Sequence, residues 1–365
     1  MSVAGLAAVG AAGVPWLSVL VPAYNVERYV RECLESVTRQ AKGEGVEIVV
    51  IDDCSTDRTI DILKEMEAED PELLRCERLP VNGGLYKARN LLLEMARGDY
   101  VWFLDSDDRM KEGAIASLKG IVARDTPDFV LCDFSVLGVE EGKRWNRRSK
   151  RRVVSFDGPQ RKFVADRSAL IAGMFNAQKM QVWSKIFRRD LLDRSTKLPE
   201  GRHFEDIAFS PTVALRASSF YYEPTPWIDY RRTPTGIVST MTPAKYVELT
   251  HALAMAAGTI EPHLADLSTS AVHAFRHFCV KHFVTSLRGL LRYPRDEERA
   301  RKLEACFDNF RRTVEDDGLA LAVEFARNGR LNSWLKLVAW KARARRAIRR
   351  DSGRTPSMPR PKAAV

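Results

Sequence analysis

The sequence predicts an α/β protein in which a largely parallel sheet, with helices on both faces, is followed by a mostly helical C-terminal region. Three observations lead to this prediction. Short apolar runs alternate with segments of helical spacing through the first third of the chain. Polar and acidic residues come directly after several of these runs. From about residue 243 onward, apolar residues recur mainly at helical spacing.

The expected strands are short, continuous apolar runs. They cover Leu17 to Val21, Val46 to Ile51, Tyr100 to Leu104 and Phe129 to Phe134. Strands of a parallel sheet are buried on both faces, so their sequences are apolar throughout and do not alternate. The four runs are therefore typical of a sheet interior.

Helices are expected between these strands, because apolar residues there recur three or four positions apart. Asp57 precedes the second helix, where a carboxylate favours the positive N-terminal end. The defining apolar positions are Val30, Cys33, Leu34 and Val37; Ile60, Leu63 and Met66; Leu85, Ala88, Leu92 and Met95; and Ala114, Leu118 and Ile121. Alternating strands and helices form βαβ units, whose ligands bind at the carboxyl ends of the strands.

The chain is expected to divide into one large domain and a helical region with short flanks. A loop with Gly, Trp and basic residues at about 138–155 interrupts the alternating pattern. The expected parts are a flexible extension at 1–15, a domain at 16–240 with halves at 16–135 and 156–240, a helical region at 243–350 and a disordered tail at 351–365.

The composition is that of an ordinary globular protein, with 45% hydrophobic and 29% charged residues. The net charge is +10, and basic residues concentrate at 143–152 and 341–350, which favours either an anionic partner or a solvated surface. The six cysteines form no Cys-x-x-Cys pair, so neither a zinc site nor a disulfide framework is predicted. No apolar run reaches the roughly 18 residues that span a bilayer, and we expect a cytoplasmic protein.

The strongest local signal is the acidic segment Leu104-Asp105-Ser106-Asp107-Asp108, directly after an expected strand. Carboxylates this close repel one another unless a cation or raised pKa values relieve the repulsion. Mg²⁺ and Mn²⁺ prefer oxygen ligands and commonly bind one or two carboxylates together with substrate phosphates. A turn that caps a helix would use the same residue types, so the segment alone fits both interpretations equally well.

Two further segments carry polar groups at expected strand ends. Asp52 and Asp53 can accept hydrogen bonds from a base or a ribose, whereas the Ser, Thr and Asp that follow them are explained by helix capping. Asn82-Gly83-Gly84 opens a helix and allows a ligand to approach the backbone closely, and Arg89 lies about one turn further on, where it can pair with a phosphate. Neither the dinucleotide fingerprint nor the P-loop pattern is present.

Four motifs occur in order: Val19-Leu20-Val21-Pro22-Ala23-Tyr24-Asn25, Asp52-Asp53-Cys54-Ser55-Thr56-Asp57, Asn82-Gly83-Gly84 with Ala88-Arg89-Asn90, and Asp105-Ser106-Asp107-Asp108. Together they closely resemble glycosyltransferase family 2, which has the GT-A fold, a Rossmann-like nucleotide-binding sheet with helices on both faces. The resemblance covers residues 16–135 well and continues more weakly to about 240. It implies inverting transfer from a nucleotide-diphosphate sugar, most often a UDP-sugar, with Mn²⁺ or Mg²⁺ as cofactor.

The resemblance also implies roles for residues of the donor side. Pro22 and Tyr24 are similar to residues that line the nucleobase pocket, and Asp53, with Asp52 beside it, to the carboxylate that reads the base. Cys54 departs from the family, which usually has Gly at this position.

The remaining donor-side roles concern the phosphates and the metal. Arg89 resembles the basic residue near the nucleotide. Asp105 and Asp107 resemble the Asp-x-Asp pair, in which Asp107 or Asp108 holds the metal that bridges the diphosphate.

The second half carries a weaker match. Trp183-Ser184-Lys185-Ile186-Phe187 and the later Glu205-Asp206 are similar to the acceptor-side segment of the family, which implies Asp206 as general base and Glu205 as the reserve candidate. The alternative is that both acids only favour a helix N-terminus. Arg231 or Arg232 would stabilise the departing diphosphate, although two solvated arginines fit as well.

The sequence thus predicts a glycosyltransferase of hexosyltransferase type that acts on a hydroxyl of a glycan, lipid-linked or cell-envelope acceptor. No nucleic acid is expected as partner. Residues 331–350 combine Trp334 and Trp340 with a basic end, so they either lie on an anionic membrane, at the inner face of the plasma membrane, or pack on the enzyme. Two rival functions are a degenerate nucleotide-sugar-binding module that acts through this basic tail and a sugar-nucleotide pyrophosphorylase. The latter needs a Gly-rich basic loop where this chain has Pro22 to Asn25.

Overall fold

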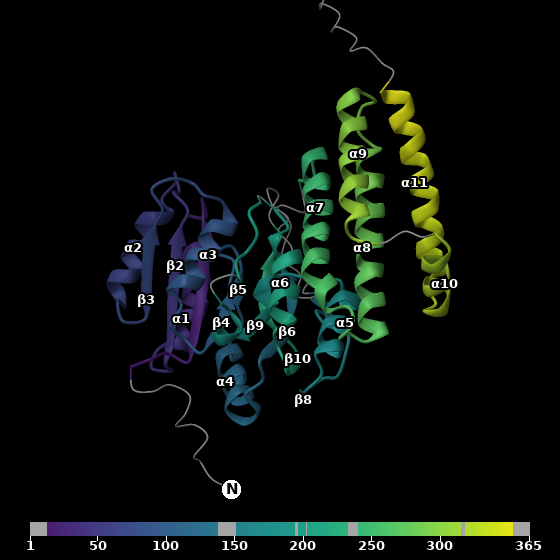
Figure 1. Ribbon diagram of the computed structural model, residues 1–365. Coiled ribbons are helices and arrows are strands. Elements are labelled where there is room, and N and C mark those ends of the chain that lie inside the picture. The colour runs from purple at the N-terminus through teal and green to yellow at the C-terminus, as the bar shows by residue number, and fades with distance from the viewer. Residues whose placement is uncertain are drawn as a thin grey trace, which may run out of the picture.

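The computed structural model describes residues 13–137, 151–193, 196–201, 203–232, 240–314 and 318–352. Most of the expected N-terminal extension, the greater part of the loop at 138–155 and nearly all of the expected tail lie outside these ranges. The described chain forms one sheet with helices on both faces and a group of C-terminal helices packed beside it (Figure 1).

Within the described ranges the sheet has ten strands, in the order β3-β2-β1-β4-β9-β6-β10-β5, with β7 on β6 and β8 on β10. The strands are β1 (Leu17–Ala23), β2 (Val46–Asp52), β3 (Leu74–Arg78), β4 (Tyr100–Phe103), β5 (Arg109–Met110), β6 (Phe129–Leu137), β7 (Arg151–Val153), β8 (Phe163–Val164), β9 (Lys185–Arg188) and β10 (Phe220–Arg231). Strands β3, β2, β1 and β4 run parallel, as expected for βαβ units. Strand β9 runs antiparallel between β4 and β6, so the complete sheet is mixed.

The helices cover both faces of this sheet. They are α1 (Val30–Ala41), α2 (Thr59–Glu69), α3 (Leu85–Met95), α4 (Ala114–Asp125), α5 (Arg167–Ala177), α6 (Glu205–Ala214), α7 (Pro243–Ile260), α8 (Thr269–Leu290), α9 (Glu297–Arg311), α10 (Leu319–Arg327) and α11 (Leu331–Asp351). The apolar residues of α1, α2 and α4 share one core with one face of the sheet. Helices α3, α5, α6 and the C-terminal helices share a second core with the other face.

Alternate residues of the buried strands supply these two cores. In β1, Val19 and Val21 belong to the core under α1, α2 and α4, whereas Leu20 belongs to the core on the opposite face. This is the two-sided burial that a continuous apolar run predicts. It also fixes the register of the strand, because a shift of one residue would move every side chain to the opposite face of the sheet.

The C-terminal helices begin at side chains that cap them. Thr242, Ser268 and Asp296 each accept a hydrogen bond from the backbone N–H three residues further on, at the starts of α7, α8 and α9. Helices α10 and α11 lie outermost on the side of the molecule away from β3 (Figure 1). Helix α11 ends at Asp351, which is buried and pairs with Arg299 of α9, so the first residue of the expected tail belongs to the folded region.

Candidate active site

The loops after β1 and β2 are joined by hydrogen bonds at the carboxyl edge of the parallel strands. The backbone N–H of Asn25 donates to the Ser55 hydroxyl at 3.0 Å, and the Asn25 side chain accepts from the backbone N–H of Thr56 at 2.8 Å. Strands β1 and β2 pair in parallel up to Ala23 and Asp52, so their ends lie at one edge. The loops after β1 and β2 therefore lie side by side at this edge.

Hydrogen bonds also join the loop after β2 to the segment Asn82-Gly83-Gly84. Both carboxylate oxygens of Asp53 accept backbone hydrogen bonds, from Gly83 at 2.6 Å and from Gly84 at 2.8 Å. The Asn82 side chain donates to the Asp53 carbonyl at 3.0 Å. Asp53 thus positions the start of α3, while each of its carboxylate oxygens keeps further lone-pair capacity for a ligand.

Asp52 is fully buried at the end of β2. One of its carboxylate oxygens accepts from the Ser55 backbone and faces Arg78, and the other, Oδ1, has no hydrogen-bond partner among the described residues. Cys54 follows in the left-handed region with a φ of 61°. That conformation favours glycine, which explains why the resembled family usually has Gly there.

Pro22 and Tyr24 differ in exposure at the end of β1. Pro22 is buried within the strand, whereas the Tyr24 side chain is 47% exposed just after it. Tyr24 is therefore available for stacking, and Pro22 shapes the backbone beneath it.

Arg89 is the centre of the acidic part of the site. Its side chain is 2% exposed and pairs with Asp105 at 2.6 Å, with Glu205 at 2.6 Å and with Asp206 at 2.8 Å. These carboxylates come from the loop after β4 and from the first turn of α6. Arg89 therefore joins both segments to its own helix, α3. A phosphate-binding role for Arg89 would require it to leave these partners, and the described geometry favours a positioning role.

Glu205 and Asp206 open α6 but differ in access. The Glu205 side chain is 3% exposed, whereas that of Asp206 is 21% exposed. Burial and repulsion by Asp206 raise the pKa of Glu205 to about 7. Burial also raises the pKa of Asp206, against the opposing effect of Arg89.

The Lys185 side chain is buried near the acidic pair of Glu205 and Asp206. Its ammonium group donates to the carbonyl oxygens of Lys179 at 2.9 Å and Gln181 at 2.7 Å. Burial lowers the pKa of Lys185 to about 7, and its positive charge favours the ionised form of Asp206. The sequence motif around Lys185 predicts no role for this residue, although a lysine within an apolar strand is a signal of a buried charge.

The acidic loop after β4 combines burial with like charges. Burial and the charge of Asp105 raise the pKa of Asp107 to about 6. Burial, followed by the charges of Asp107 and Asp105, raises the pKa of Asp108 well above its usual range. Asp108 Oδ1 accepts from the Arg231 backbone at 2.7 Å, and its Oδ2 is buried without a partner among the described residues.

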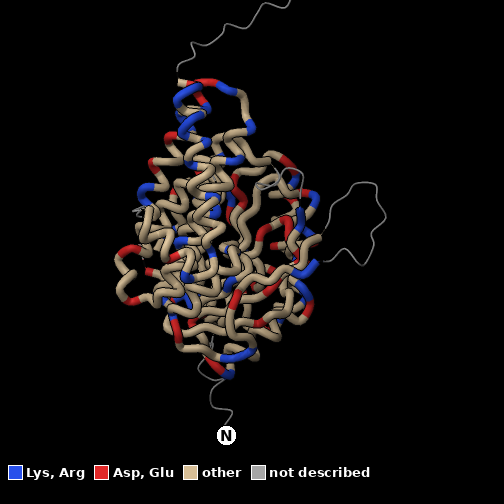
Figure 2. Tube along the Cα trace, turned by 90° about the vertical axis from the view of Figure 1, so that its right-hand side faces the viewer, with Lys and Arg blue, Asp and Glu red and all other residues tan. Residues whose placement is uncertain are grey.

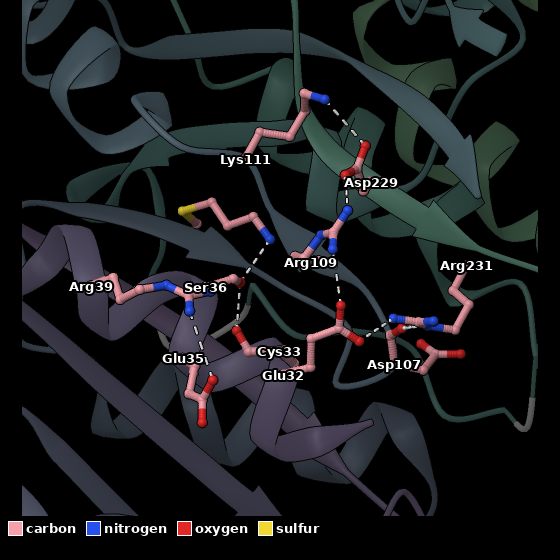
Figure 3. Close-up of polar contacts among 11 residues, drawn as sticks. Glu32, Cys33, Glu35, Ser36, Arg39, Asp107, Arg109, Lys111, Asp229 and Arg231 are labelled. Carbon is pink, nitrogen blue, oxygen red and sulfur yellow. Dashed lines mark hydrogen bonds and ion pairs between the residues drawn. The ribbon is translucent and has the colours of Figure 1, made fainter. Parts of the chain in front are cut away.

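Arg231 at the end of β10 holds this loop from the other side. Its guanidinium donates to the Asp107 carbonyl at 2.9 Å and to Glu32 at 2.7 Å (Figure 3). It also lies over the Tyr29 ring. Glu32 also pairs with Arg109 at 2.9 Å. Sequence reasoning missed Glu32, because its helical position gave no sign that it faces β10.

Figure 3 shows that this network continues from Arg109 to Asp229, which is also paired with Lys111. It joins α1, β5 and β10 around the acidic loop. Arg232, the alternative to Arg231, is exposed, and its backbone N–H donates to the Leu137 carbonyl at 3.3 Å.

The described residues contain no group of three or more His, Cys, Asp or Glu side chains arranged to hold a metal ion. Asp107 and Asp108 offer at most two carboxylates. A divalent ion with an incomplete set of protein ligands takes the rest from water and substrate phosphates. The unpartnered Asp108 oxygen and the crowded charges fit such an ion.

The strand order, with acidic loops at the carboxyl edge of the parallel strands, defines the GT-A class of α/β fold. Over 90% of this chain and 91% of that chain, it superimposes on S. aureus TarS 1–349 solved with UDP-GlcNAc, with a TM-score of 0.65 at 23% identity. Residues 18–192 match the family model described as "Glycosyl transferase family 2", and this part of the chain is a family 2 glycosyltransferase domain.

Curated relatives agree with this family. The chain is 31% identical over 228 residues to the putative glycosyltransferase EpsH of Bacillus subtilis, covering 61% of this chain and 63% of EpsH. It is 44% identical over 98 residues to the putative teichuronic acid biosynthesis glycosyltransferase TuaG of the same organism, covering 27% of this chain and 38% of TuaG. The chain spans less than two thirds of the length of EpsH and of TuaG.

Proposed function

We propose that this chain is an inverting glycosyltransferase that transfers a sugar from a nucleotide-diphosphate donor to an acceptor hydroxyl, with Asp206 as general base. The observation that carries the base assignment is the difference in access within the acidic pair. Glu205 is closed off at 3% exposure, whereas Asp206 at 21% exposure can be reached by a hydroxyl. The raised pKa of Asp206 also makes it a stronger base for the acceptor proton.

In the proposed reaction, the acceptor oxygen forms a bond to the anomeric carbon while the bond from that carbon to the diphosphate oxygen breaks. The acceptor proton passes to Asp206, and the nucleoside diphosphate leaves from the opposite face, so the configuration inverts. Arg89 fixes the orientation of Asp206 and ties it to Asp105 on the donor side. Such orientation is worth a large part of the rate in reactions between two bound substrates.

Asp107 or Asp108 would hold Mn²⁺ or Mg²⁺, which would neutralise the diphosphate leaving group. The unpartnered Asp108 Oδ2 and the raised pKa values of both carboxyls support this assignment. Arg231 would keep the loop in place through the Asp107 carbonyl and the Asp108 carboxylate.

On the nucleotide side, we assign Tyr24 and Pro22 to the nucleobase and Asp52 and Asp53 to base or ribose hydroxyls. The unpartnered Oδ1 of Asp52 and the exposure of Tyr24 support these roles. Asn82 and Gly83 place backbone close to the bound donor through their contacts with Asp53.

We propose a UDP-sugar as donor, because the structural neighbour TarS was solved with UDP-GlcNAc. We propose a glycan, lipid-linked or cell-envelope acceptor, since the name of the relative TuaG refers to a cell-envelope polysaccharide. The enzyme would act in the cytoplasm, at the inner face of the plasma membrane. No helix of the described residues is long and apolar enough to cross a membrane.

The test is a donor screen that measures nucleoside diphosphate release with Mn²⁺ or Mg²⁺ across sugar nucleotides. Asp206→Asn should bind the donor with unchanged calorimetric affinity and lose transfer by roughly 10²- to 10⁴-fold. Glu205→Gln is the matched control and should retain more activity. Full transfer by Asp206→Asn would refute the base assignment.

The metal assignment is tested separately by Asp107→Asn. This variant should weaken donor binding in the presence of the metal and leave the weak metal-free binding unchanged, because it removes a ligand and no base contact. Equal affinities of the variant and the wild type across a titration of Mn²⁺ would contradict the assignment.

A further inference from the structure

Exposed apolar side chains gather on the two last helices. Among the described residues, ten large hydrophobic side chains are exposed, and five of them lie on α10 and α11. A cluster of this kind on a protein surface marks an interaction site more often than scattered single residues do. The five are Leu319 and Val323 of α10 and Leu331, Leu335 and Val338 of α11.

On α11 these residues form one line along the helix. Leu331, Leu335 and Val338 are spaced at i, i+4 and i+7, and they are 43%, 50% and 46% exposed. The opposite face, with Leu337, Ala344 and Ala347, is buried against the protein. The exposed line is therefore not the face that holds the helix in the fold.

The same line continues into arginines. After Ala342, the next turns present Arg345, Arg346 and Arg349, all of them exposed. Figure 2 shows the α11 side facing the viewer, with Lys and Arg predominating over Asp and Glu at the upper end, where α11 ends. Asp351, the acidic residue of α11, is buried in its pair with Arg299. We call this surface, Leu331 to Arg349 on the exposed side of α11 together with Leu319 and Val323, the α10–α11 face.

The tryptophans of this region do not belong to the face. Trp334 and Trp340 are partly buried and pack against the core. The guanidinium groups of Arg288 and Arg343 both lie over the Trp340 ring. The packing alternative drawn from the sequence therefore applies to the tryptophans, which fix α11 to the protein, while a different set of side chains faces outward.

We infer that the α10–α11 face binds an anionic lipid surface, with its leucines and valines entering the interface and its arginines contacting lipid headgroups. A membrane boundary is apolar on one side and negatively charged on the other, as this line of residues requires. A nucleic acid would leave the leucines in water, since its surface offers phosphates. A second copy would bring identical arginine-rich segments together, and like charges disfavour that contact.

Lipid binding does not depend on the proposed function. Its consequence does: an enzyme held at the bilayer surface would meet a lipid-linked acceptor there.

The experiment is co-sedimentation of the full chain with vesicles of phosphatidylcholine, with and without phosphatidylglycerol. The wild type should bind the phosphatidylglycerol vesicles and lose this binding at high salt. Arg346→Gln/Arg349→Gln should weaken binding by roughly 30-fold at low salt, because each basic residue near an anionic surface contributes about fivefold. Leu335→Ser/Val338→Ser should weaken it by about tenfold or more.

Matched controls remove the same chemistry elsewhere. Arg39→Gln/Lys42→Gln removes two exposed charges at the end of α1, and Val154→Ser/Phe163→Ser removes two exposed apolar side chains near β7 and β8. Both should bind vesicles as the wild type does. Nucleoside diphosphate release from the donor in solution should be unchanged in all four variants, which separates this inference from the proposed function.

Several results would overturn the inference. They are equal affinity of the wild type for both vesicle types, losses in the controls as large as in the variants, and wild-type vesicle binding by Leu335→Ser/Val338→Ser. Light scattering that shows a dimer, which the same apolar substitutions dissociate, would assign the face to a second copy instead.

Discussion

Arg89 and Arg231 hold the two ends of one acidic loop, but they do so in different surroundings. Arg89 is 2% exposed and neutralises part of the charge of three carboxylates. Arg231 is 16% exposed, pairs with the half-exposed Glu32 and contacts the loop mainly through backbone and carbonyl groups. Arg89 is therefore the buried centre of a group of charges, whereas Arg231 is partly exposed and holds the loop by hydrogen bonds.

This difference predicts that the two arginines affect different properties, namely the stability of the fold and the position of the acidic loop. A buried group of charges becomes strongly unfavourable when one partner is removed, whereas a partly exposed ion pair contributes little to stability. We therefore expect the Arg89 side of the loop to control whether the site folds. The Arg231 side should control where the metal-binding carboxylates lie.

The largest effect is expected for Arg89→Met. Three carboxylates would remain close together without their cation, so unfolding should become easier by about 3–5 kcal/mol. Chemical denaturation followed by circular dichroism measures this change. Arg89→Met/Glu205→Gln should recover at least about 1 kcal/mol, since it removes one of the repelling charges. A double variant no more stable than Arg89→Met would show that Arg89 acts by packing alone.

A smaller effect on stability, and a larger one on activity, is expected for Arg231→Met. The backbone hydrogen bond from residue 231 to Asp108 remains, and only the contacts to Glu32, the Asp107 carbonyl and the Tyr29 ring are lost. The stability should change by less than about 1 kcal/mol. Transfer should fall by roughly tenfold to a hundredfold because the loop is displaced.

Steady-state kinetics against metal concentration measures this second change. Glu32→Gln is the control, because it weakens the ion pair and leaves the contact between Arg231 and the Asp107 carbonyl in place. If Arg231→Met destabilised the protein as much as Arg89→Met does, the proposed division between the two arginines would be wrong.

The sequence predicted the parallel half of the fold because its signals are local. Strands β1, β2, β4 and β6 are apolar runs, and α1 to α4 lie where helical spacing placed them. Strand β3 was missed because it is an edge strand whose last two residues are exposed, so it lacks an apolar run. The antiparallel insertion of β9 between β4 and β6 was not predictable either, since it depends on pairing between residues far apart in the chain.

The site shows the same limit. The motifs placed Asp105, Asp107 and Asp108 at a strand end, and the structure places them there. The burial of Arg89 was not predictable, because its partner Asp206 lies 117 residues away. Spacing within a motif indicates which residues share a loop. It does not indicate which distant carboxylate will pair with a buried arginine.

The smallest expected effect is a shift of the pH profile of transfer. It tests the carboxylates that pair with Arg89 under conditions in which the protein stays folded. The base must be ionised to act, so transfer should fall as the pH drops through the raised pKa of Asp206, and this fall is the acid limb of the profile. Glu205→Gln removes a repelling neighbour, which lowers the pKa of Asp206 and moves this acid limb to lower pH. Lys185→Met removes a neighbouring positive charge and should move the limb to higher pH. Profiles of kcat/KM against pH measure both shifts, and shifts in the same direction would show that the two residues act on the base only through packing.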